Sequence, residues 1–370
     1  MSATATTLVA EGSSALSEGT SEGNQRAVTL FEQALGADPR CAPAYVGLAN
    51  AYLARATESR TGQPWLDRAI EAGETALELD PSRREGYLVL GLAYRTKGML
   101  DKEQKLWLRR LQVDPSDAIA RTREGWVLWF TGRPDEALTW LSAAAAQRPE
   151  HEWIQRWVYF FLGNANLALG DFAEAQRMYH KQLSLNPDHS SAQAGLIWSL
   201  LAGNNDEEAR HQLSRFEANS YDGDRYPLKI ADIEYFLGDD GKAAVYARDA
   251  LAEVDGRYWP RGLLASTILG GVLWPSDRSA AVVHLRTSEE IDRERLDDGD
   301  EGYMPHIDLA AIHAIRGDAR AACRSLRAAI DAGWRYPALA VRDRIFESLR
   351  TDREFVFLMA ASLTNRPESL

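Results

Sequence analysis

The feature that most constrains this sequence is a repeated spacing. Pro81, Pro115 and Pro149 lie 34 residues apart, and each ends a stretch rich in alanine and leucine. A period of this length is typical of a helix–turn–helix unit that recurs along the chain. A chain of 370 residues would otherwise be expected to form two or three globular domains. An array grows by adding neighbours instead, so the spacing determines the architecture.

Small and aromatic residues recur at fixed places within these units. Tyr87, Leu90, Gly91 and Tyr94 follow one another at spacings that put them on one face of a helix. Glycine at the third of these positions lets the paired helix approach closely. A second glycine stands where the first helix must end, because glycine tolerates the left-handed conformation of a helix terminus. The close-approach positions are Gly91, Gly125 and Gly163, and the turn positions are Gly98, Gly132 and Gly170.

These residues closely resemble the tetratricopeptide repeat (TPR) family. The segments Tyr87–Tyr94 and Val158–Pro187 match the family pattern nearly throughout, with Leu-Gly, Tyr, Gly, Ala, an aromatic residue, Ala and Pro in order. The resemblance implies an all-α fold: a right-handed superhelical solenoid of antiparallel helix pairs. We count about nine TPR-like units and expect C-terminal capping helices, since an exposed array end would aggregate.

The match to the pattern varies along the chain and predicts four regions. They are an N-terminal segment with a first, partial unit (1–41), regular units (42–216), divergent units (217–335) and a C-terminal cap (336–370). The first helix of the partial unit is expected over roughly Leu8–Gly19. Extra residues in the turn Ala54–Gln63 and around His151–Gln155 lengthen two units. Such insertions either shape a binding site or are surface excursions.

Two passages look like a narrower group, the bacterial TPR modules that are often fused to adenylate cyclases, protein kinases or winged-helix regulators. These passages are Ala27–Ala56 and Asp308–Met359. No cyclase, kinase or DNA-binding segment is visible in the sequence. The likeness therefore implies only the sensor or scaffold half of those proteins.

Composition narrows the classes of partner. The formal net charge is −12, which argues against nucleic acid, whose affinity depends largely on Lys and Arg meeting phosphates. It argues equally against an anionic membrane surface and is compatible with a basic partner. The N-terminus lacks the features of a secretory signal, so we expect a cytoplasmic protein. Cys41 and Cys323 are expected to be free thiols, as is usual in a reducing compartment.

The resemblance places a stripe of groove-facing residues on the first helix of each unit. The predicted ligand-binding groove comprises Arg95, Trp126, Trp129, Phe130, Trp157, Phe160, Asn164 and Trp198. Aromatic residues concentrate on this face, and exposed apolar patches commonly mark binding sites. Two interpretations are open. The rings line a groove for a protein or peptide partner, with an apolar or basic segment, or a tightly curved superhelix packs them against one another and the capping helices.

Motifs for catalysis, metals or phosphates are missing. His306 and His313 lie seven residues apart, whereas metal pairs on a helix prefer a separation of four. The carboxylate clamp of chaperone-binding TPR proteins needs Lys where Val46 stands, although Asn50 fits its asparagine position. The acidic run Glu289–Glu301 is expected to be a solvated loop. We therefore predict a scaffold with no cofactor. The alternatives are a sensor that acts with a separate catalytic or DNA-binding partner, and an enzyme with its pocket inside the superhelix.

Overall fold

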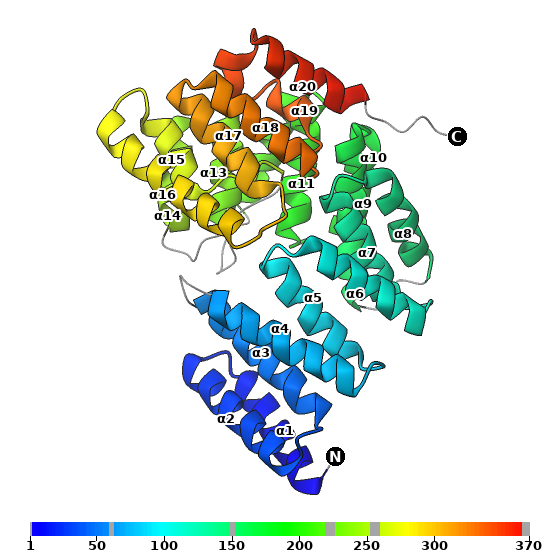
Figure 1. Cartoon of the computed structure of the whole chain (residues 1–370). Helices are drawn as coiled ribbons and strands as arrows, with labels where there is room; N and C mark the ends of the chain where they lie inside the picture. Colours follow the sequence, from blue (N-terminus) through cyan, green and yellow to red (C-terminus); the bar gives the residue numbers. More distant parts are fainter. Residues whose placement is uncertain (1, 59–62, 148–151, 219–225, 252–259, 365–370) are drawn as a thin grey trace. The chain divides into compact units, whose positions relative to one another are not determined.

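The computed structural model describes residues 2–58, 63–147, 152–218, 226–251 and 260–364 (Figure 1). Every regular element within these ranges is a helix. The chain divides into two compact units, Met1–Asp117 and Ala118–Leu370. Each unit is built from helix pairs in which consecutive helices pack on one another.

Unit 1 contains three helix pairs. They are α1 (Ala3–Leu16) with α2 (Ser21–Ala37), α3 (Ala42–Glu58) with α4 (Gln63–Leu79), and α5 (Arg84–Thr96) with α6 (Leu100–Val113). The hydroxyl of Thr20 caps α2 by accepting a hydrogen bond from the Gly23 amide at 3.0 Å. The turn that joins α1 to α2 is therefore short and fixed, and it brings the two helices side by side.

Unit 2 contains six helix pairs and a C-terminal cap. The pairs are α7 (Ala118–Phe130) with α8 (Pro134–Ala146), α9 (Glu152–Leu169) with α10 (Phe172–Leu185), α11 (Ser190–Ala202) with α12 (Asp206–Ala218), α13 (Tyr226–Leu237) with α14 (Asp240–Leu251), α15 (Ala265–Leu273) with α16 (Arg278–Asp297), and α17 (Met304–Arg316) with α18 (Ala319–Asp331). The cap comprises α19 (Pro337–Ala340), the 3₁₀ helix η1 (Arg344–Leu349) and α20 (Arg353–Thr364). The described residues thus hold nine pairs, and the predicted all-α array of helix pairs is confirmed.

The repeated glycines have the roles that their spacing predicts. A Cβ atom on Gly91 would lie 2.5 Å from the ring of Trp107, and one on Gly163 would lie 2.5 Å from the ring of Tyr179. Both contacts are far shorter than van der Waals distance, so the paired helices approach closely only because these side chains are absent. The turn glycines Gly98, Gly132 and Gly170 all adopt positive φ, from 76° to 79°.

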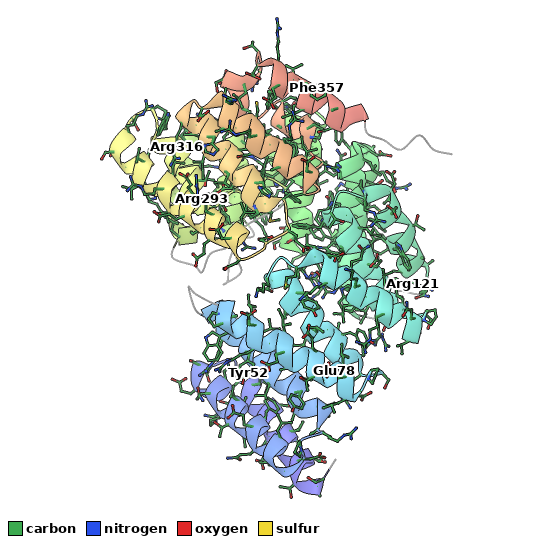
Figure 2. All side chains as sticks on the ribbon, in the orientation of Figure 1. Tyr52, Glu78, Arg121, Arg293, Arg316 and Phe357 are labelled. Carbon is green, nitrogen blue, oxygen red and sulfur yellow. The ribbon has the colours of Figure 1, made fainter. Side chains whose placement is uncertain are left out.

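Two expectations about local structure were wrong. The first helix covers Ala3–Leu16 and not Leu8–Gly19, because Ser2 caps its start and the turn begins at Ser17. Most of the acidic run Glu289–Glu301 is helical, since α16 continues to Asp297. Within this run, Glu289 accepts hydrogen bonds from Arg293 and Arg316. Both arginines are labelled in Figure 2.

The remaining expectations concern the two insertions, the two cysteines and the absence of a membrane-spanning helix. Residues 59–62 of the first insertion and His151 of the second lie outside the described ranges. Cys41 and Cys323 are free and buried. Among the helices of the described ranges, none is both long enough and apolar enough to cross a membrane.

Candidate functional site

An open hollow of about 390 Å³ lies on one face of unit 1. Its walls come from α1 and α3, which contribute Val9, Leu16 and Val46. The start of α5 closes one end of the hollow with Arg83 and Glu85. Because α1, α3 and α5 are the first helices of their pairs, the hollow lies on the face that the repeat pattern assigns to the inner side of the array.

An aromatic ring lies beneath the floor of this hollow. Phe31 projects from α2 and is fully buried. It lies between Gly12 of α1 and Gly47 of α3, where added Cβ atoms would come within 2.7 Å and 2.4 Å of the ring. The two glycines therefore let α1 and α3 close around Phe31. The resulting floor and walls are apolar and held in place by packing.

Polar side chains form the rim, and they present oxygen atoms. The hydroxyl of Ser13 donates to the Val9 carbonyl at 2.8 Å, and that of Ser17 donates to the Ser14 carbonyl at 2.7 Å. The amide nitrogen of Asn50 donates to the Val46 carbonyl at 3.1 Å. The two hydroxyl hydrogens and one amide hydrogen of Asn50 are thus used, and the side-chain oxygens remain as acceptors beside the second amide hydrogen of Asn50.

The rim also carries charge at the start of α5. Arg83 pairs with Asp80 at 3.2 Å and with Glu85 at 3.7 Å. The Glu85 side chain is 65% exposed, so its carboxylate is open to a ligand. Further along the same face of α5, Leu92 is 44% exposed. The predicted groove residue Arg95 follows it and pairs with the fully buried Glu103 at 3.2 Å.

The predicted aromatic residues of unit 2 are packed against their own chain. Trp126 stacks on Phe130 at 5.1 Å, and Phe130 lies 4.8 Å from the ring of Tyr303. The indole nitrogen of Trp129 donates to the Tyr336 hydroxyl at 2.8 Å. Trp126 and Trp129 are therefore buried, and Phe130 is half-buried.

The remaining predicted residues show the same behaviour. Trp198 is fully buried and meets Phe236 edge-on at 5.4 Å. Phe160 is buried beside Tyr179, whose hydroxyl donates to Asn164 at 2.8 Å. Trp157, in α9, is half-buried and stacks on Phe161 at 6.0 Å.

The burial of Trp126, Trp129 and Trp198 favours the interpretation in which the rings pack within unit 2. Trp126 packs on Phe130, Trp129 is hydrogen-bonded to Tyr336, and Trp198 packs on Phe236. A ligand role for Trp157 or Arg95 stays a prediction.

Family models support the repeat assignment. Tetratricopeptide repeat models match residues 14–57, 118–143, 166–226 and 304–328. The chain contains tetratricopeptide repeats. The match over 118–143 falls on α7 and α8, and the match over 304–328 falls on α17 and α18, so each coincides with a helix pair of the structure.

Solved structures of TPR proteins resemble this chain in fold. A tetratricopeptide repeat protein from Parabacteroides merdae is 13% identical, with a TM-score of 0.56, over 72% of this chain and 98% of its own. A thermophilic TPR protein from Thermus thermophilus is 25% identical, with a TM-score of 0.41, over 53% of this chain and 99% of its own. A search of curated proteins gave no match.

A buried histidine caps a helix in unit 2. The Nδ1 atom of His189 accepts a hydrogen bond from the Ala192 amide at 3.1 Å and so caps α11. The rings of Trp157 and Phe160 lie 4.9 Å and 5.3 Å from the imidazole. Burial lowers the pKa of His189 to about 4, so the imidazole is neutral at pH 7 and serves as a cap.

Sequence reasoning missed most of the hollow. Val9 and Ser13 lie on α1 and Ser17 directly follows it. This helix matches the TPR pattern poorly, so no register assigned these residues to a face. Asn50 and Val46 were recognised as inner-face positions but only as parts of an absent carboxylate clamp. The signal that points to the hollow is the pair of glycines, Gly12 and Gly47, that face Phe31.

Proposed function

We propose that this protein is a cytoplasmic TPR scaffold that binds an extended segment of a partner protein in the hollow of unit 1. The segment places an apolar side chain over Phe31 and directs N–H donors, from its backbone or from Lys or Arg, to the rim. One observation carries the proposal: unit 1 holds an apolar hollow with oxygen acceptors around its edge.

The size of the hollow supports binding of a side chain and its flanking backbone. Its volume of about 390 Å³ lies within the range of ligand pockets, roughly 300–1,000 Å³. Burying one large apolar side chain over Phe31 would contribute about 1.5–3 kcal/mol. The floor is held by packing, so little ordering entropy is lost when the ligand binds.

The rim favours a ligand that is rich in donors. Ser13 and Ser17 donate their hydroxyl hydrogens to backbone carbonyls of α1, so their oxygens, like that of Asn50, can act as acceptors. Glu85 adds a carboxylate, and charge-assisted hydrogen bonds to carboxylates are stronger than neutral ones. A basic residue next to the apolar side chain of the ligand therefore fits the end of the hollow near α5.

The same residues support binding over catalysis. Among the described residues that line the hollow there is one carboxylate, Glu85, and neither histidine nor cysteine. A general acid–base pair or an activated nucleophile needs at least two such groups within hydrogen-bonding reach.

Two adjacent serines on α1 give a matched test. Ser13 lines the hollow, whereas Ser14 does not, and both are exposed. Peptides selected from a random display library on the full-length protein are expected to carry an apolar residue beside Lys or Arg. Ser13→Arg fills the hollow and adds positive charge, so it should weaken binding of these peptides at least about tenfold, or about 1.4 kcal/mol.

The control variant is Ser14→Arg, which adds the same charge to the same helix outside the hollow. It should leave the affinity within about twofold of the wild type. Fluorescence anisotropy with one labelled peptide measures all three proteins. Equal affinities for the wild type and both variants would refute the proposed site.

A sensor is the alternative function that the likeness to bacterial regulatory modules suggests. In that case occupancy of the hollow would be transmitted to a separately encoded catalytic or DNA-binding protein. The genes that neighbour this one distinguish the two, because a sensor is expected beside a cyclase, a kinase or a winged-helix regulator.

A further inference from the structure

A buried arginine joins three segments of unit 2. Arg261, in the stretch that leads into α15, donates from Nε to Asp343 at 2.9 Å and from Nη1 to Asp232 at 2.5 Å. Its Nη1 also donates to the backbone carbonyl of Asp232 at 3.0 Å. Asp232 belongs to α13, and Asp343 immediately precedes η1. The guanidinium thus ties the C-terminal segment Trp334–Leu349 to α13.

The cluster of Arg261, Asp232 and Asp343 contains more acidic than basic groups. Two carboxylates share one guanidinium, and all three residues are at most 5% exposed. The rings of Trp198, Tyr235 and Phe236 surround the guanidinium at 5.6–5.9 Å. With both carboxylates ionised, the cluster would hold one uncompensated negative charge away from water, which is costly.

The hydrogen bonds show where a proton would reside. The Oδ1 atom of Asp343 accepts from the Ile345 amide at 3.0 Å, and its Oδ2 accepts from Arg261. Both oxygens of Asp343 are therefore used as acceptors, which favours its ionised form. The Oδ2 atom of Asp232 is buried and has no hydrogen-bond partner among the described residues. A proton on Asp232 neutralises the cluster.

Other charged groups near this cluster are held by partners of their own. On α13, Lys229 donates to the hydroxyls of Ser190 and Ser191. On either side of Asp343, Arg342 pairs with Asp206 and Arg344 pairs with Asp240. From α17, Asp308 accepts from the Leu264 amide and from Thr267. In the described part of the chain, Arg261 is the cation that contacts Asp232.

We propose that Asp232, Arg261 and Asp343 form a proton-controlled latch over the aromatic face of unit 2. With a proton on Asp232 the latch is neutral and holds the segment Trp334–Leu349 closed. Loss of that proton traps a negative charge and lets the segment open more readily. Opening would expose the rings that the segment contacts, including Trp129, whose indole nitrogen donates a hydrogen bond to the Tyr336 hydroxyl.

The titration range follows from the same geometry. Burial raises the pKa of Asp232 to about 7, because desolvation outweighs the attraction of Arg261 and the charge of Asp343 adds to it. A carboxyl whose folded pKa is raised contributes stability that is fully present below its unfolded pKa of about 4 and is lost as pH rises through the folded value. The latch therefore weakens between about pH 4 and pH 7.

Hydrogen exchange of the full-length protein measures the opening of this segment. After correction for intrinsic exchange rates, the opening constant of amides in 334–349 should rise about fifty-fold between pH 5 and pH 7 and then level off. Asp232→Asn mimics the protonated side chain, so its opening constant should change less than about threefold over the same range.

Asp206→Asn is the matched control. It breaks the exposed ion pair with Arg342 in the same segment but removes no buried charge. It should raise the opening constant by the same factor at every pH and keep the wild-type slope. A flat wild-type profile, or an equal slope in Asp232→Asn and the wild type, overturns the latch.

A second measurement needs no variant. In the wild-type protein labelled with ¹³C at aspartate carboxyl carbons, one resonance should titrate near pH 7 while the unfolded chain titrates near pH 4. If every aspartate of the folded protein titrates below about pH 5, the proposal is wrong, whatever the variants do.

Discussion

The tight contact between Gly163 and Tyr179 makes a quantitative prediction about how the repeats pack. Tyr179, from α10, is fully buried, and its ring faces Gly163 of α9 and Gly195 of α11. Cβ atoms at these glycines would come within 2.5 Å and 2.6 Å of the ring. The Tyr179 hydroxyl is also fixed by its hydrogen bond to Asn164. The ring is therefore enclosed on both sides and anchored at its tip.

Gly163→Ala should destabilise unit 2 despite the better helix propensity of alanine. Overpacking costs about 1–3 kcal/mol, and a shift of the ring weakens a buried hydrogen bond worth about 1 kcal/mol. Alanine returns about 1 kcal/mol through helix propensity. We expect a net loss of about 1–3 kcal/mol in the free energy of unfolding, measured by urea denaturation followed by tryptophan fluorescence.

A control and a rescue separate steric overlap from a general effect of alanine. A Cβ at Gly36, near the end of α2, would meet nothing within 4 Å, so Gly36→Ala should be neutral or stabilising by up to about 1 kcal/mol. Adding Tyr179→Leu to Gly163→Ala makes room for the methyl group and should cost less than the two single changes together. A Gly163→Ala protein as stable as the wild type would refute this account of the repeat packing.

Two further changes test unit 2. Because burial lowers the pKa of His189 to about 4, the contribution of His189 to stability is present above about pH 6.5 and is lost as pH falls toward 4. His189→Asn keeps a capping acceptor but does not titrate, so it should flatten this part of the pH profile of the thermal-denaturation temperature. A profile identical to that of the wild type would contradict this role of His189. Trp129→Phe removes the donor to Tyr336 and should lower the free energy of unfolding by about 1 kcal/mol. A double-mutant cycle with Tyr336→Phe should show coupling between the two changes, and strictly additive losses would count against the bond.

The turns and the close helix contacts within one repeat could be predicted from the sequence because they depend on residues that are near one another in the chain. The turn glycines and the close contact of Gly91 with Trp107 both follow from the spacing of one repeat. The helical part of the acidic run was missed because charge alone suggests solvent. Glu289 is instead satisfied by Arg293, one turn along α16, and by Arg316 on the next helix.

The burial of the aromatic stripe depends on contacts between residues distant in sequence, which a repeat pattern does not predict. The spacing predicts one face of α7, but the residue that is hydrogen-bonded to Trp129 on that face is Tyr336, which lies 207 residues away in sequence. The same distant segment brings Gly333 against Gly132, where a Cβ on Gly132 would lie 2.7 Å from the Gly333 Cα atom. A periodic pattern describes what each helix offers to the inner side of the array. It cannot say whether the chain later fills that side itself.

Whether the inner face of a unit is accessible to a ligand therefore depends on the side chains of that unit. In unit 1, Gly12 and Gly47 close two helices onto Phe31 and leave a hollow above the ring. In unit 2, tryptophans occupy the corresponding helices, and Trp129 of α7 is hydrogen-bonded to Tyr336 at the start of the C-terminal cap. Burying large rings stabilises the fold, in keeping with the buried tryptophans of unit 2. The hollow of unit 1 is lined instead by residues such as Val9, Val46, Ser13 and Asn50. The less aromatic face is thus the better candidate for a ligand in this chain.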